Sequence, residues 1–181
     1  MKIAFVCPDG ISILLFCRGI LSELKLADSN AEVFAVIGDN EHIHEITALG
    51  VKVVVVPMYR FFGPIEDLKT AFGLYRVFRH ERFDIVINFS TKPNIYGTIA
   101  AYLAATPQRL FHVVGMGSTF LSQSSIKGRI LQKVFLALYR IACRLAHKVW
   151  FTNKNDLAFF IDNGMIKCNN TVLTKNYLDT N

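Results

Sequence analysis

The middle of this 181-residue chain contains no acidic residue. Between Ile85 and Asn155 there are nine Lys or Arg side chains and no Asp or Glu. The whole chain has a net charge of +6, so the remainder carries −3 and the basicity is local. The missing carboxylates argue against hydrolytic general acid/base chemistry in this tract. A positive, acid-free region instead favours an anionic ligand such as a phosphate, a nucleotide or a lipid headgroup.

Long apolar runs are also absent, although 52% of the residues are hydrophobic. No uninterrupted apolar stretch reaches the roughly 18 residues that a membrane-spanning helix needs. Pro8, Asp9 and Gly10 interrupt the first apolar run after a few residues, so no signal peptide is expected. The apolar content instead suits a parallel α/β sheet covered on both faces, or a protein that lies on a membrane surface.

Common cysteine, histidine and glycine motifs are missing too. The four cysteines show no CxxC spacing, which predicts buried free thiols in a reducing cytoplasm. His42 and His44 are two residues apart on a predicted helix and point in different directions, so no metal site is expected. The first strand is followed by Gly10 without the full GxGxxG pattern, which argues against a dinucleotide cofactor.

Strand and helix patterns alternate along the entire chain. Apolar or β-branched runs predict strands at residues 2–7, 32–37, 51–56, 83–89, 109–114, 148–152 and 171–174. Segments of helical period predict helices at residues 12–26, 41–49, 65–80, 94–104, 126–147 and 156–163. This order predicts a single α/β domain of Rossmann-like, three-layer architecture with a mostly parallel sheet.

Two of these strands end in polar loops within the acid-free tract, where a parallel sheet collects its ligands. The first loop contains Thr91, Lys92 and Asn94. Thr91 or Asn94 can cap the following helix without any ligand. A lysine beside a helix N-terminus is unfavourable unless an anion is present, so Lys92 predicts a loop that faces the substrate.

The other loop and the first turn offer weaker signals. Gly115, Gly117, Ser118 and Thr119 can form a backbone nest for an oxyanion, or an ordinary flexible loop. Gly10 would let the backbone approach a phosphate, and Arg18 lies on the helix that follows. An ordinary turn and an exposed surface arginine are the alternatives for these two residues.

The predicted helix at residues 126–147 has two faces. Its apolar positions are predicted to enter the core, and they are Ile130, Val134, Leu138, Ile141 and Leu145. Its basic residues fall within an arc of about 100°, and they are Arg129, Lys133, Arg140 and Arg144, continued by Lys148. This face predicts contact with anionic lipid, with a plain solvated face as the alternative. Nucleic acid ranks lower, because aromatic residues do not interleave with the basic ones.

Several segments resemble the amino-terminal domain of the family-four glycosyltransferases, which have the GT-B architecture of two facing Rossmann-like domains. They are FDIVINFSTKPNIYGTIAAYLA at residues 83–104, GMGSTF at 115–120, KVWFTNKNDLAFF at 148–160, the opening MKIAFVCPDG and CRGIL at 17–21. The resemblance covers nearly the whole chain. It implies that residues 1–181 form the acceptor-side half of a GT-B enzyme, without the C-terminal donor-binding domain.

The resemblance implies a glycosyltransferase of the hexosyltransferase type. Such an enzyme moves a sugar from a nucleotide-sugar to an acceptor, here a lipid-linked saccharide of bacterial polysaccharide or glycan biosynthesis, with no metal or resident cofactor. Gly10 would approach the donor diphosphate, and the loops after Phe89 and Val114 would line the acceptor cleft. The protein would be cytoplasmic and peripheral at the inner face of the cell membrane, held there by Arg129, Lys133, Arg140 and Arg144.

Three further interpretations stay open at this point. The chain is either a truncated fragment or one subunit of a split enzyme, with a second domain or subunit binding the donor. A rival interpretation is a non-catalytic, membrane-associated subunit that recruits or activates a separate catalytic partner. The third is a small nucleotide-binding α/β protein without sugar chemistry.

Overall fold

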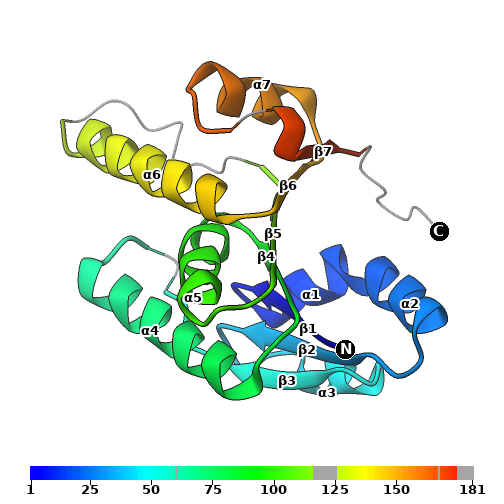
Figure 1. Ribbon diagram of the computed structural model, residues 1–181. Helices are drawn as coiled ribbons and strands as arrows, with labels where there is room; N and C mark the ends of the chain where they lie inside the picture. The colour runs from blue at the N-terminus through cyan, green and yellow to red at the C-terminus, as the bar shows by residue number, and fades with distance from the viewer. Residues whose placement is uncertain (60, 116–125, 167, 175–181) are drawn as a thin grey trace.

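The core of the molecule is a seven-stranded parallel sheet. The computed structural model describes residues 1–59, 61–115, 126–166 and 168–174 (Figure 1). The strands lie in the order β3-β2-β1-β4-β5-β6-β7. Their bounds are β1 Lys2–Cys7, β2 Glu32–Ile37, β3 Lys52–Val55, β4 Ile85–Phe89, β5 Gln108–Val113, β6 Lys148–Phe151 and β7 Thr171–Leu173. The Rossmann-like, parallel α/β fold predicted from the sequence is confirmed.

Helices cover both faces of the sheet, as Figure 1 shows for α1 and α2 on one side and α4, α5 and α6 on the other. The helices are α1 Gly10–Phe16, α2 Arg18–Ala27, α3 Ile43–Ala48, α4 Pro64–Glu81, α5 Thr98–Leu103, α6 Ile126–Leu145 and α7 Lys154–Asp162. A π-helix, η1 (Pro93–Gly97), precedes α5, and a 3₁₀ turn, η3 (Cys168–Asn170), precedes β7. Buried strands flanked by helices on both sides explain the high apolar content.

Three clusters of buried side chains hold these layers together. The first lies beneath α1, α2 and α3 and includes Phe5 and Ile13. The second lies beneath α4 and includes Leu74. The third joins α6 and α7 to β5 and β6 and includes Tyr139 and Phe160.

The direction of winding reverses beside β1. From β1 the chain moves outward through β2 to β3, and α4 then returns it to β4 on the other side of β1. Val6 of β1 pairs with Asn88 of β4, so both strands end at the same edge of the sheet. In open α/β sheets, ligands bind in the crevice at such a switch point.

Two helices differ from their predicted form. The predicted helix at residues 12–26 is divided at Cys17 into α1 and α2, and it starts earlier because the Asp9 carboxylate accepts the N–H of Ser12 at 2.9 Å. The predicted helix at residues 94–104 begins as the π-helix η1. Short π-helical segments are rare and are frequently found at functional sites.

Candidate functional site

The turn from β4 into η1 lies at the switch-point edge of the sheet. Ser90 has a φ angle of 75°, a left-handed conformation that is uncommon for a residue other than glycine. Its carbonyl oxygen accepts the N–H of Asn94 at 2.9 Å and closes the turn. Backbone conformations of this kind concentrate at functional sites. The turn therefore places Thr91 and Lys92 at the switch-point edge of the sheet.

Lys92 forms a buried ion pair within the chain. Its Nζ lies 2.5 Å from Oδ1 of Asp67 on α4 and 2.6 Å from the carbonyl oxygen of Phe61. The side chains of Lys92 and Asp67 are only 11% and 3% exposed. The inference that Lys92 needs an anionic ligand must therefore be corrected, because Asp67 supplies the anion. The sequence analysis did not predict this partner, because Asp67 lies before the acid-free tract that contains Lys92.

Tyr96 of η1 completes this buried network. Its hydroxyl donates to Oδ2 of Asp67 at 3.0 Å, so both carboxylate oxygens have partners. Burial and the adjacent Asp67 carboxylate raise the pKa of the Tyr96 hydroxyl, which stays protonated as a donor. The network joins the loop after β3, the first turn of α4 and η1.

Asn94 and Thr91 connect η1 to its neighbours. Asn94 is 1% exposed, and its Nδ2 donates to the carbonyl oxygen of His112 on β5 at 2.9 Å. Burial raises the pKa of Tyr139 on α6 to about 12, although hydrogen bonds with Thr91 and Asn94 oppose the shift. The contact of both residues with an acceptor stays a prediction, and for Asn94 it requires the covering side chains to move.

Gly10 and Arg18 lie at the first β-to-α connection. The N–H of Gly10 donates to Oδ1 of Asp39 at 3.0 Å, and a Cβ at this position would lie 2.2 Å from the carbonyl oxygen of Glu41. Packing within the chain thus explains the glycine, and Asp39 already occupies the N–H that a diphosphate would use. Arg18 is exposed at the start of α2. The ligand roles of both residues stay predictions.

His112 is a residue of the site region that the sequence pattern did not single out, because it lies within an apolar strand. It is 6% exposed at the carboxyl end of β5. Its ring stacks on Trp150 with 4.3 Å between centroids and meets Phe89 edge-on at 5.3 Å. Within the described part of the chain, neither ring nitrogen has a hydrogen-bond partner. Burial lowers the pKa of His112 to about 4, so the ring is neutral near pH 7.

The loop after β5 is described only at its start. Gly115 is exposed, with a φ angle of 152° and open space where a Cβ would lie. Gly117, Ser118 and Thr119 lie outside the described residues. The oxyanion nest expected here stays a prediction.

The face that α6 turns towards the core is not the predicted one. Its buried positions follow a helical period through Phe135, Tyr139, Ala142 and Ala146, which directly follows the helix. Ile130, Val134 and Ile141 are 59%, 40% and 44% exposed, so their predicted burial is wrong. Phe135, Tyr139 and the two alanines join one buried cluster with Phe111 of β5 and Val149 of β6.

The exposed side of α6 is therefore apolar as well as basic. Arg129, Lys133 and Arg144 are exposed, and none of them forms an ion pair with an acid among the described residues. Arg140 differs, because its Nη2 donates to the carbonyl oxygen of Asn163 at 2.9 Å. Three of the four residues predicted to contact a membrane are thus available to solvent.

A second group of exposed apolar side chains adjoins α6. Phe62, in the loop after β3, packs against Phe135 of α6 with 5.6 Å between ring centroids. Figure 1 shows the amino-terminal ends of α4 and α6 on the same side of the molecule. We define the α4–α6 surface as the exposed side chains of Tyr59, Phe61, Phe62, Ile65, Leu68, Lys69, Phe72, Arg129, Ile130, Lys133 and Val134.

Among the described helices, none is both long and apolar enough to cross a bilayer.

The sequence and the fold together match a known family. Residues 2–153 match the family model described as glycosyl transferase 4-like. The chain belongs to this family. The resemblance to the family-four glycosyltransferases, predicted from segments spread over nearly the whole chain, is thereby confirmed.

Two relatives of the chain have named activities. The chain is 31% identical over 166 residues to the N,N'-diacetylbacillosaminyl-diphospho-undecaprenol alpha-1,3-N-acetylgalactosaminyltransferase of Campylobacter jejuni, covering 91% of this chain and 43% of the relative. It is 35% identical over 78 residues to the UDP-Gal:alpha-D-GlcNAc-diphosphoundecaprenol alpha-1,3-galactosyltransferase of Escherichia coli, covering 42% of this chain and 20% of the relative. The chain therefore spans less than half the length of these relatives.

Solved structures share the fold at low sequence identity. The lipopolysaccharide outer core galactosyltransferase WaaB superposes with a TM-score of 0.67 at 12% identity, over 97% of this chain and 46% of that chain. HepE of Anabaena, in complex with UDP and glucose, gives a TM-score of 0.63 at 17% identity, over 97% and 44% of the two chains. The described domain thus has the fold of one half of a GT-B glycosyltransferase.

Proposed function

We propose that this chain is the acceptor-side half of a glycosyltransferase that moves a sugar from a nucleotide-sugar to a lipid-linked saccharide diphosphate in bacterial glycan assembly. The observation that carries the proposal is the 31% identity over 166 residues to an enzyme named for a diphospho-undecaprenol acceptor. The Escherichia coli relative is also named for a diphosphoundecaprenol acceptor. In this proposal the donor is a substrate, and no metal or resident cofactor takes part.

The acceptor saccharide would lie in the crevice at the carboxyl ends of β1 and β4. The turn at Ser90 and the exposed Gly115 border this edge from two neighbouring strands. Thr91 and the predicted oxyanion nest at Gly117, Ser118 and Thr119 would supply polar contacts to it. Lys92 would act indirectly, by holding the Ser90 turn through Asp67, since its ammonium already has two oxygen partners.

The α4–α6 surface would bring the domain to the membrane that carries the lipid. Its exposed aromatic and aliphatic side chains are suited to the boundary between headgroups and acyl chains. Arg129 and Lys133 lie on the same helix as Ile130 and Val134, so cationic and apolar contacts would form together. The protein would therefore be peripheral at the cytoplasmic face of the membrane.

The donor would be bound largely by a second domain or subunit. An isolated Rossmann-like half leaves a nucleotide-sugar open to solvent on one side, where developing charge is poorly stabilised. At the first β-to-α connection, the Asp39 carboxylate accepts the Gly10 N–H and adds negative charge. This arrangement supports a domain whose main ligand is the acceptor.

A binding experiment on the 181-residue chain tests this proposal. We expect the chain to bind a polyprenyl-diphosphate-linked saccharide in nanodiscs more tightly than nanodiscs containing the polyprenol alone. Calorimetry against free UDP and UDP-sugars should give weak or no binding. Tight nucleotide binding without acceptor binding would instead indicate the nucleotide-binding α/β protein. A sugar-transfer assay with the complete two-part enzyme, in which this chain proves dispensable, would contradict the proposal and favour a recruiting subunit.

A further inference from the structure

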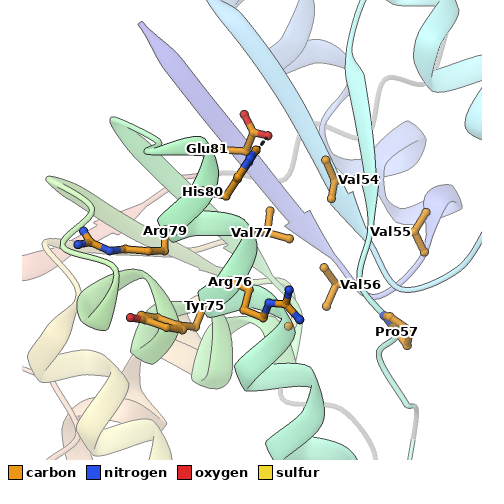
Figure 2. A pocket seen from close by; sticks show the side chains of 11 residues that line it. Val54, Val55, Val56, Pro57, Tyr75, Arg76, Val77, Arg79, His80 and Glu81 are labelled. Carbon is orange, nitrogen blue, oxygen red and sulfur yellow. Dashed lines mark hydrogen bonds and ion pairs between the residues drawn. The ribbon is translucent and has the colours of Figure 1, made fainter.

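A groove lies at the outer edge of the sheet, and β2 and β1 separate it from the switch point between β1 and β4. It has a volume of about 650 Å³ and lies between β3 and α4. Figure 2 shows Val54 of β3 and Val56, which follows it, on one wall and Val77 of α4 facing them. The groove is open to solvent along an edge of the sheet that the proposed sugar transfer does not use.

α4 lies close to the chain just after β3. Thr70 donates from Oγ1 to the carbonyl oxygen of Pro57 at 2.9 Å. At Gly73, a Cβ would lie 2.8 Å from Cγ1 of Val56, so the helix approaches the strand closely there. Val54 and Val77 line the groove and are only partly buried.

The backbone of β3 is open on its outer side. β3 is the edge strand, and the next residue, Val56, donates its N–H inward to the carbonyl oxygen of Ile37 at 2.8 Å. Because successive residues of a parallel strand bond to opposite sides, Val53 and Val55 direct their N–H and C=O groups outward. No other strand of the described chain pairs with them. An open edge of this kind is a template for another extended segment.

The charged side chains that line the groove favour an acidic segment of another chain. The Arg76 side chain lies beside Val56 and Pro57 at one end of the groove (Figure 2). Its guanidinium has no acidic partner within ion-pair distance among the described residues. Glu81, at the other end, is already held by Lys2 at 3.2 Å and His80 at 3.1 Å. A second copy of the same cationic groove would be repelled, whereas a carboxylate would be attracted.

We propose that the β3 edge and this groove bind an extended, acidic segment of a partner protein, which adds to the sheet as a further strand beside β3. Main-chain hydrogen bonds to Val53 and Val55 would supply the affinity. A carboxylate paired with Arg76, together with an apolar side chain between Val54 and Val77, would supply the selectivity. This surface is independent of the proposed sugar transfer, so either proposal can fail without the other.

Synthetic peptides test the site on the 181-residue chain. The probe alternates valine and glutamate, one control carries lysine in place of glutamate, and another has N-methyl groups on alternate amides. We expect the acidic probe to shift the NMR amide signals of Val53 and Val55, and both controls to bind at least about ten-fold more weakly. Equal binding of all three peptides, no binding, or shifts confined to the α4–α6 surface would overturn the proposal.

Matched variants locate the charge contact. Arg76→Glu should weaken binding of the acidic probe by about ten-fold or more, while Lys154→Glu, exposed on α7, should change it less than about two-fold. Thermal unfolding of both variants checks that the fold is kept. Equally weakened binding of the acidic probe in both variants would overturn the proposal. So would a dimer in sedimentation velocity that Val55→Pro abolishes, because a second copy would then occupy the edge.

Discussion

The ammonium of Lys92 and the carboxylate of Asp67 lie 2.5 Å apart in the interior, between the turn after β4 and the first turn of α4. The Phe61 carbonyl and the Tyr96 hydroxyl complete the hydrogen bonds of the two charges. The pair therefore holds the aromatic loop after β3 against η1. A lysine at a helix N-terminus, which otherwise opposes the helix dipole, is explained by this contact.

Removing one partner of this pair should destabilise the protein strongly. We expect Lys92→Met to lower the free energy of unfolding by about 3–5 kcal/mol, because Asp67 would be left buried without a counterion. Urea denaturation at neutral pH measures the loss. Lys92→Met combined with Asp67→Leu should recover much of it, since a buried pair can be replaced by apolar side chains at little cost.

The exposed pair of Lys52 and Glu32 provides the control. Its charged atoms lie 2.7 Å apart, but the side chains are 62% and 45% exposed. Lys52→Met should therefore have a much smaller effect than Lys92→Met, because water already solvates both charges. Similar decreases in the free energy of unfolding of the two variants would contradict the inference that the buried Lys92–Asp67 ion pair matters more to stability than the exposed one.

Gly97 should tolerate no side chain. A Cβ there would lie 2.0 Å from Oδ1 of Asn88, which is fully buried and donates from Nδ2 to Thr98 Oγ1 and the Leu110 carbonyl at 3.3 Å each. Because Asn88 cannot move without losing these bonds, Gly97→Ala should destabilise the protein by about 1–3 kcal/mol. Gly19→Ala, on a helix with open space around the Cβ, should instead be neutral or stabilising by up to about 1 kcal/mol. Thermal unfolding measures the stability of both variants. An unchanged stability of Gly97→Ala would show that η1 repacks around the added methyl group.

The sequence predicts the sheet well because local patterns determine it. Runs such as Val53–Val54–Val55 and the strand ending at Phe89 indicate buried strands without knowledge of any contact. The partner of Lys92 could not be predicted in this way, because Asp67 lies 25 residues earlier on another element. Only the packing of α4 against η1 brings the two charges together.

The orientation of α6 was not predictable for a different reason. Apolar residues occur around most of this helix, so Ile130 and Val134 compete with Phe135 and Tyr139 for the core. Periodicity alone allows either of two faces of α6 to be buried. In the structure the Tyr139 face is buried, because the Tyr139 ring packs against Phe111 of β5. The basic arc could be predicted because it contains no acidic residue.

The α4–α6 surface should bind anionic membranes. The double variant Arg129→Glu, Lys133→Glu should weaken binding to vesicles containing phosphatidylglycerol by about 30-fold or more, since each basic residue near such a surface contributes about 1 kcal/mol. Lys154→Glu on α7 is the control and should have little effect. Liposome sedimentation measures both, and raised salt should weaken binding of the unaltered chain. Equal binding to neutral and anionic vesicles would exclude the electrostatic contact.

His112 should make the stability of the protein depend on pH. Burial lowers its pKa from 6.5 to about 4, so between these values the unfolded chain binds more protons than the folded chain. Above pH 6.5 His112 is neutral in both states, and its effect on the free energy of unfolding does not change with pH. As the pH falls from 6.5 towards 4, the free energy of unfolding decreases by up to about 3 kcal/mol. His112→Phe, which keeps an aromatic ring against Trp150, should flatten this slope in urea denaturation, and His44→Gln at an exposed position should not. Carboxylates such as Glu81, whose pKa is lowered beside Lys2 and His80, titrate in every variant, so the difference between curves isolates His112. An unchanged slope in His112→Phe would mean that the folded chain protonates this imidazole as readily as the unfolded chain, as it would if water reached the ring.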